Sequence, residues 1–217
     1  MPDVICDPSL PDAVFLRCPP TSGTIWFAAT PVTVRWFRAV ATGALLAGWA
    51  AALRGDERCP VDCGWNLARA LCGRIERQIH RCTGDAGWKV RLPYEAEWEA
   101  AVRAGTTSAW HFGDDARELP DHAWFAANAG ARVHPVGTKR PNPWGLYDVY
   151  GNVDEWCADD PSRPQARWED EPLALQRVVR GGSCEALASE CASSARRLVL
   201  FGNPMNEPIG LRPVLVR

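Results

Sequence analysis

The tryptophan content of the chain limits its possible folds more than any other feature does. Eleven of the 217 residues are Trp, and the chain also contains 18 Gly and 18 Pro. A buried Trp needs apolar contacts and also a hydrogen-bond partner for its indole N–H. Gly and Pro interrupt helices and strands with turns. We therefore predict an irregular core lined by aromatic rings and supported by many loops.

Size and charge indicate one globular domain. Hydrophobic residues make up 47% of the chain and charged residues 23%, which is typical of folded proteins. A length of 217 residues is short for two independent domains. We expect the proline-rich residues 1–24 to form an extended lead-in and residues 25–217 to form a single domain. The net charge of −2 favours neither a nucleic-acid partner nor a membrane partner.

The cysteines predict a location in the cytoplasm. There are nine, and the first residues lack the basic segment and apolar stretch that mark a secretory signal. An odd number of cysteines without such a signal favours reduced thiols over a framework of disulfides.

Helical periodicity is confined to the first half of the chain. Helices are expected at residues 33 to about 53, 65 to about 81, and 93 to about 105. After Gly105, short apolar stretches alternate with Gly, Pro, Asn and Asp. Short strands are expected at residues 25–27, 176–180 and 211–216. Helices followed by an irregular half of strands and loops indicate an α+β fold.

A series of sequence blocks follows in a fixed order after residue 90. They are RLPYEAEWE at 91–99, VRAGTT at 102–107, HPVG at 134–137, PNPWGLYD at 141–148, GNVDEWC at 151–157, RVVRGGS at 177–183 and GLRPV at 210–214. In this order the blocks resemble the formylglycine-generating-enzyme, or sulfatase-modifying-factor, family. The resemblance covers residues 25–214 and is weakest before residue 59. It implies a loop-rich, C-type-lectin-like fold with small antiparallel sheets and two or three helices, a fold that supports many functions.

The resemblance implies a structural calcium site in the acidic loop from 148 to 155. By position, Asp148 and Glu155 would give side-chain oxygens, and Gly151 and Val153 would give backbone oxygens. Calcium takes six to eight hard oxygen ligands, which a tight turn can supply. In the alternative interpretation, backbone N–H groups and a nearby Arg satisfy both carboxylates. The sequence leaves both interpretations open.

The cysteines near the C-terminus decide how we interpret catalysis. Catalysts of the family bind Cu(I) through two thiolates, three and eight residues after the Ser of the GGS turn, and Cu(I) prefers sulfur ligands. Here Ser183 is that Ser and Cys191 fills the second position, but Ala186 fills the first. Cys184 lies two residues earlier, which displaces its sulfur by about 6–7 Å along a strand. We therefore do not expect Cu(I), and Cys191, Cys184 and Ser183 are catalytic candidates only if the chain is an enzyme.

The function predicted from the sequence is non-catalytic binding of a protein or a small ligand. Apolar residues on a loop often mark an interaction site, and this stretch lines the exposed face of lectin-like folds. The predicted contact residues on the C-terminal loop face, about 184–208, are Cys184, Glu185, Leu198, Leu200, Phe201, Asn203 and Asn206. The alternative is a copper-dependent formylglycine-generating oxidase or a related enzyme. A third possibility is an accessory subunit of a bacterial signalling or defence assembly, or a retroelement variable protein.

Overall fold

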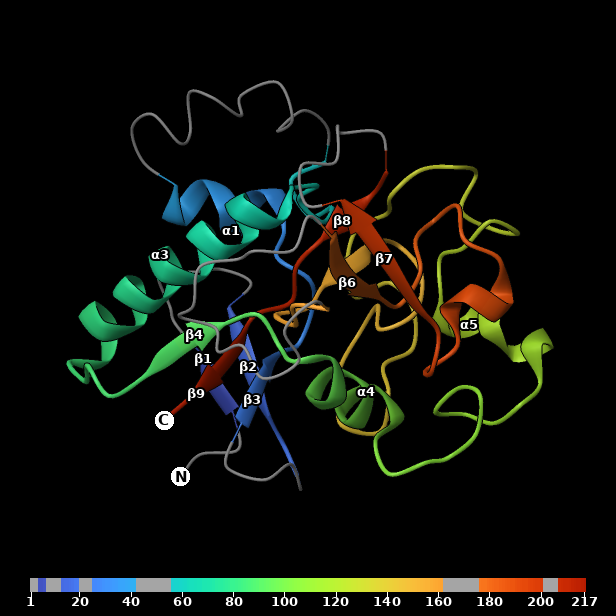
Figure 1. Cartoon of the computed structure of the whole chain (residues 1–217), viewed down its shortest axis with the longest axis horizontal. Helices are drawn as coiled ribbons and strands as arrows, with labels where there is room; N and C mark the ends of the chain where they lie inside the picture. The colour runs from blue at the N-terminus through green and yellow to red at the C-terminus, as the bar shows by residue number, and fades with distance from the viewer. Residues whose placement is uncertain (1–3, 7–12, 20–24, 42–55, 162–175, 201–206) are drawn as a thin grey trace.

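A five-stranded antiparallel sheet brings the two ends of the chain together (Figure 1). The computed structural model describes residues 4–6, 13–19, 25–41, 56–161, 176–200 and 207–217. The sheet has the order β1 (Val4–Cys6), β2 (Val14–Cys18), β3 (Ile25–Ala28), β9 (Val214–Val216) and β4 (Lys89–Arg91). Parts of the expected lead-in are thus strands of this sheet, and the strand expected at 25–27 is confirmed as β3.

Helices α1 and α3 lie next to each other beside this sheet (Figure 1). Helix α1 (Val34–Val40) begins at Thr33, whose hydroxyl accepts a hydrogen bond from the Trp36 N–H at 3.1 Å. The rest of the expected helix, residues 42–55, lies outside the described residues. Helix α3 (Trp65–Thr83) confirms the predicted periodicity, since its buried residues recur at helical spacing. It ends at Gly84, which adopts the left-handed conformation with φ +69°.

Helix α4 (Glu95–Arg103) begins two residues later than the sequence predicts. Tyr94 is extended and caps the helix, and its backbone N–H donates to the Glu97 carboxylate at 2.8 Å. Pro93 therefore lies outside the helix and not in its first turn. Beyond α4 the helical segments of the described residues are all short, and they are η1 (Ala116–Glu118), α5 (Leu119–His122) and η2 (Ala188–Cys191).

A second sheet of four short strands forms the other half of the molecule. Its order is β7 (Arg196–Leu200), β6 (Gln176–Arg180), β5 (Asp154–Trp156) and β8 (Ile209–Gly210). Strand β6 has the predicted bounds. The strand predicted at 211–216 is shorter, because the chain leaves β8 at Gly210 and enters β9 only at Val214. Residues 211–213 thus connect the two sheets.

Tryptophans line the core, as their number predicts. Trp26, Trp36, Trp98 and Trp156 are completely buried. The Trp156 indole N–H donates to the Cys63 carbonyl at 2.7 Å, and that of Trp65 donates to the Cys157 carbonyl at 3.1 Å. These bonds join segments more than 90 residues apart in the sequence. In the parts of the chain that the structure describes, no helix has the length and apolar character needed to cross a bilayer.

Candidate functional site

The acidic loop is organised around the buried guanidinium of Arg212. This side chain is 1% exposed and lies in the connection between the two sheets. Its Nε and Nη2 donate to the Glu155 carboxylate, with Nη2 2.7 Å from Oε1. Its Nη1 donates to the Ala28 carbonyl at 2.9 Å, and Nη2 donates to the Tyr147 carbonyl at 2.7 Å. The guanidinium therefore joins β3, the acidic loop and β5.

The geometry of the loop itself requires glycine at one position. Gly151 has φ +68°, and a Cβ there would lie 2.1 Å from the Trp124 carbonyl oxygen. Asp148, also with a positive φ, is 2% exposed, and its carboxylate accepts the Gly137 N–H at 2.7 Å. Burial raises the pKa of Asp148 to about 6. The loop is thus held by backbone contacts and by a largely buried carboxyl.

These contacts correspond to the second interpretation of the loop, in which protein donors satisfy the carboxylates. Both oxygens of Glu155 accept from Arg212, and Oε2 also accepts the Trp98 indole N–H at 2.7 Å. A calcium ion at Glu155 would have to displace one of these donors, so the residues as arranged do not fit the expected calcium site. Among the described residues, no group of three or more His, Cys, Asp or Glu side chains is placed to hold a metal ion.

The two C-terminal cysteines are buried thiols. Cys184 is 2% exposed and Cys191 is completely buried. Burial, followed by the negative charge of Glu185, raises the pKa of Cys184 to about 11. Burial, followed by the negative charge of Asp154, raises the pKa of Cys191 to about 12. Both side chains are therefore protonated at neutral pH, whereas a copper ligand must be a thiolate.

Ala186 and Cys191 lie side by side at the GGS turn. Gly182 has φ +72°, and a Cβ there would lie 2.8 Å from the Cys191 sulfur and 3.1 Å from the Ala186 methyl. The two positions at which the family's catalysts carry sulfur are thus neighbours in space, and one holds a methyl group. The pair as it stands does not fit a two-thiolate copper site.

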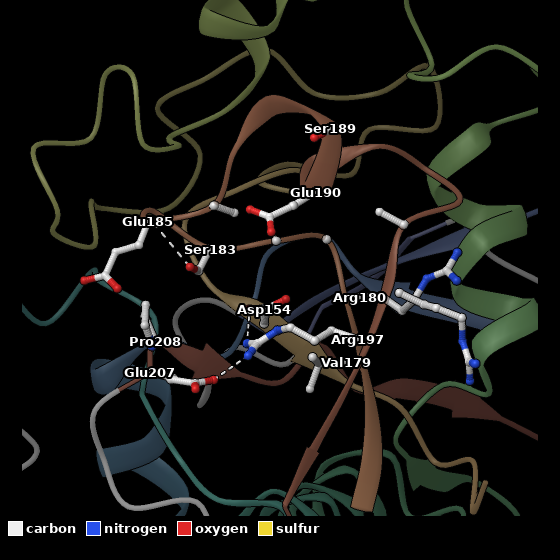
Figure 2. Close-up of a pocket in the computed structure, with 15 residues that line it drawn as sticks. Asp154, Val179, Arg180, Ser183, Glu185, Ser189, Glu190, Arg197, Glu207 and Pro208 are labelled. Atoms are coloured by element: carbon white, nitrogen blue, oxygen red, sulfur yellow. Dashed lines mark hydrogen bonds and ion pairs between the residues drawn. The ribbon is translucent and has the colours of Figure 1, made fainter.

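A pocket of about 580 Å³ lies between the second sheet and the 181–190 segment (Figure 2). Its charged lining residues are Asp154, Arg180, Glu185, Glu190, Arg196, Arg197 and Glu207. Ser183 and Ala186 also line it, whereas Cys184 and Cys191 are not among its described lining residues. The pocket is therefore next to the two positions at which the family's catalysts carry their copper ligands, but its described walls carry no thiol.

The predicted contact residues divide into four groups. Glu185 lines the pocket, whereas Cys184 is buried beneath the surface. Leu198 and Leu200 are 40% and 59% exposed on β7, outside the pocket wall. The other three predicted residues, Phe201, Asn203 and Asn206, lie outside the described residues.

The residues that sequence reasoning missed are Asp154, Arg197 and Glu207. The Arg197 guanidinium lies between two carboxylates, with Nη2 2.7 Å from Asp154 Oδ2 and Nη1 2.6 Å from Glu207 Oε2. Desolvation raises the pKa of Asp154, which is 4% exposed. The adjacent acidic residues Asp154 and Glu155, of which only Glu155 was assigned a role, were a signal that could have directed attention to this site.

The other two arginines of the pocket direct their charge away from it. Arg180 donates to Glu95 at 2.7 Å and also to Glu99, and Arg196 donates to Glu95 at 2.7 Å. Both acceptors are on α4. Of the described arginines, only Arg197 places its guanidinium between acidic residues of the pocket.

The fold and the site define a C-type-lectin-like α+β protein with an open, acidic pocket beside a GGS turn. The family described as "Sulfatase-modifying factor enzyme 1-like domain" matches residues 25–215. This chain therefore belongs to that formylglycine-generating-enzyme family, as its motifs predict.

Relatives with and without catalytic activity resemble the chain to a similar degree. It is 33% identical over 129 residues to the formylglycine-generating enzyme of Thermomonospora curvata, a match that covers 46% of this chain and 40% of that protein. It is 32% identical over 149 residues to the inactive Cα-formylglycine-generating enzyme 2 of Bos taurus, covering 64% of this chain and 42% of that one. The matches thus span less than half of these relatives.

Solved structures match over most of the chain. PvdO from Pseudomonas aeruginosa has a TM-score of 0.71 and 19% identity, with 100% of this chain and 99% of that chain covered. Treponema denticola variable protein 1 has a TM-score of 0.70 and 25% identity, with 88% of this chain and 84% of that chain covered. These matches support the predicted fold class.

Proposed function

We propose that this chain is a non-catalytic binding module, which takes a protein or a small ligand at the C-terminal loop face. The observation that carries the proposal is the pair Ala186 and Cys191 at the GGS turn. A two-thiolate copper site needs sulfur at both positions, and a methyl group cannot bind a metal. The pocket beside this pair is still open, so the fold keeps a place for a ligand where the copper chemistry is missing.

The buried thiols support the same proposal. Cys184 would have to replace the missing ligand, but burial and the adjacent Glu185 carboxylate raise its pKa to about 11. Loss of a proton from such a thiol is unfavourable at neutral pH. Burial of this kind is typical of cysteines that pack as small apolar side chains. The oxidase alternative would therefore need the buried Cys184 thiol to lose its proton on binding the metal.

A copper titration with three proteins tests the proposal. We expect the parent and Cys191→Ser to bind Cu(I) equally weakly, because a single buried thiol is a poor site. Ala186→Cys restores sulfur beside Cys191, and we expect it to gain tight Cu(I) binding. Ser183→Ala serves as a control for changes at the turn that add no sulfur. Oxidation of a cysteine-containing, sulfatase-type peptide by the parent would show that the chain is an enzyme.

The exposed leucines of β7 provide the second part of the test. Leu198 and Leu200 are two residues apart on β7, so their side chains face the same side of the strand. We propose that they border the surface that the ligand or partner contacts. Once a ligand is known, Leu198→Ser with Leu200→Ser is expected to weaken its binding at least about tenfold, the effect of losing about 1.4 kcal/mol. Ala86→Ser, at an exposed apolar residue outside the 184–208 face, is the control.

A further inference from the structure

We propose that His111 and His122 bind one Zn²⁺ ion, with water completing its coordination. His122 is the last residue of α5 (Figure 1), and His111 lies in the segment between α4 and η1. Neither histidine lines the pocket beside the GGS turn. A metal ion at this position is therefore a further property of the chain, independent of the proposed binding function.

Each of the two rings has one buried nitrogen without a protein partner. They are His111 Nε2 and His122 Nδ1, and no hydrogen bond from the described residues reaches either atom. The residues are 8% and 9% exposed, and their ring centroids are 4.8 Å apart. A buried polar atom without a partner is unfavourable. Two such nitrogens on rings in contact therefore indicate a ligand that both of them share.

The second nitrogen of each ring fixes the form in which the ring is present. Burial is the main cause that lowers the pKa of both histidines, and a backbone hydrogen bond opposes it in each, to the Arg140 backbone for His122 and to its own backbone for His111. A hydrogen bond that favours the protonated ring is one in which the ring N–H donates. His111 Nδ1 and His122 Nε2 are thus the donors, and the unpartnered nitrogens carry lone pairs.

This arrangement is the one that metal-binding histidines use. Such a histidine is neutral, binds the ion through one nitrogen and commonly donates its other N–H to a backbone carbonyl or a carboxylate. The charges around His122 also favour a cation, because the Glu118 and Asp121 carboxylates act on its ring. Arg140 has the opposite sign, but its guanidinium is 3.4 Å from the Asp121 carboxylate and is largely exposed.

The spacing of the rings selects the kind of ion. A tetrahedral Zn²⁺ holds imidazole nitrogens at about 2.0–2.1 Å, which places the centres of two such rings about 5 Å apart. The 4.8 Å between His111 and His122 agrees with this value. A linear two-coordinate ion would place the centres on opposite sides of the metal, about 6 Å apart. Among the described residues no third His, Cys, Asp or Glu completes the group, so water fills the remaining positions.

Calorimetry with zinc chloride on the full chain tests the site. All proteins carry Cys82→Ser, because Cys82 is an exposed thiol that would itself attract zinc. We expect one Zn²⁺ per chain, and affinity at least about tenfold lower in His111→Phe and in His122→Phe, since loss of even an outer-shell partner has an effect of this size. His80→Gln is the matched control, because His80 Nε2 already pairs with the Trp88 carbonyl at 2.6 Å. Its affinity is expected to equal that of the Cys82→Ser parent.

The nitrogen resonances of the histidine rings keep the test valid if a phenylalanine variant is poorly stable. They are measured on the Cys82→Ser protein alone, with and without one equivalent of zinc chloride. We expect the resonances of His111 Nε2 and His122 Nδ1 to shift and those of His80 to stay in place.

Two results would overturn the proposal. If no zinc binds, water is the partner of the two nitrogens and the site does not exist. If zinc binds equally to the parent and to both phenylalanine variants, or shifts only the resonances of other histidines, the ion is held elsewhere. Neither result bears on the proposed function, which the copper titration and the assay with a cysteine peptide decide.

Discussion

The Arg212 guanidinium connects parts of the molecule that are far apart in the sequence. Its partner Glu155 is 57 residues away, and the Ala28 carbonyl is 184 residues away. Both charged side chains are 1% exposed, so each depends on the other for its solvation. When one partner of a buried ion pair is removed, the remaining charge is left without compensation.

We expect Arg212→Met to lower the free energy of unfolding by about 3–5 kcal/mol, the usual cost of breaking a buried pair. Urea unfolding measures the change. Arg140→Met is the matched control, since Arg140 is 70% exposed and faces an Asp121 that is 60% exposed. There we expect a loss of less than about 1 kcal/mol. Equal losses in the two variants would show that Arg212 is not the centre of this network.

The same pair leads to a prediction about calcium. Because Glu155 is already engaged by Arg212 and Trp98, millimolar calcium is expected to leave the melting temperature unchanged relative to excess chelator. A ligand that binds only the folded state would raise it. A calcium-dependent rise that disappears in Asp148→Asn would show that the ion displaces one of these donors, and it would favour the first interpretation of the loop.

Sequence reasoning could predict part of this site but not its pairing. The alternative in which an arginine satisfies the acidic loop was available from the residue types alone. The identity of that arginine could not be predicted, because Arg212 and Glu155 are 57 residues apart in the sequence and meet only in the folded chain. The pocket pair Asp154 and Arg197 was missed for the same reason, since each residue lies on a different strand of the second sheet.

Among the elements, α5 and the loop before it each contribute one buried imidazole, and the two rings are in contact. The rings of His111 and His122 have centroids 4.8 Å apart, and both are less than 10% exposed. His111 Nε2 and His122 Nδ1 have no hydrogen-bond partner among the described residues. Burial, followed by the charge of His122, lowers the pKa of His111 to about 4. The folded protein therefore holds the His111 ring in its neutral form.

This pair predicts loss of stability in weak acid. The folded pKa of His111 is below the usual 6.5, so below pH 6.5 the unfolded chain takes up a proton that the folded chain does not. The stabilising contribution of His111 is present above pH 6.5 and decreases as the pH falls toward 4. We expect His111→Phe to reduce the loss between pH 7 and 4.5 by about 1–2 kcal/mol, measured by urea unfolding at each pH. His80→Gln, which removes a ring elsewhere, is the control, and an equal effect there would contradict this assignment.

Local pattern was sufficient for some elements and insufficient for others. Helix α3 has seven buried residues at helical spacing, so its periodicity alone identified it. The start of α4 depends on the Glu97 side chain, which caps the Tyr94 N–H, and the sequence pattern gave no reason to prefer this over Pro93. Strand β9 begins at Val214 because it pairs with β3 and β4, whose positions no local pattern specifies.

At the scale of the whole molecule, β9 is an inner strand of the first sheet. It lies between β3 and β4, and Leu215 faces Trp26 and Val90 in the pairing. Leu215 is completely buried, whereas Val216 is only partly buried. We expect Leu215→Ala to lower the free energy of unfolding by about 2–5 kcal/mol through cavity formation.

Val216→Ala is the control for Leu215→Ala and is expected to cost roughly 1 kcal/mol or less, because its side chain loses less buried area. Thermal or urea unfolding of both variants measures the difference. If the two losses are the same, the C-terminal strand does not hold the sheet together in the way that its position between β3 and β4 indicates.

Residues 207–217 belong to both halves of the molecule, since Glu207 and Pro208 border the pocket and Val214–Val216 lie between β3 and β4 in the first sheet. A ribosome-bound chain that ends before residue 207 therefore lacks both the complete pocket and strand β9. Contacts between segments this far apart in the sequence are slow to form. Such a truncated chain would also leave the edges of β3 and β4 that pair with β9 without a partner, and unpaired strand edges favour aggregation.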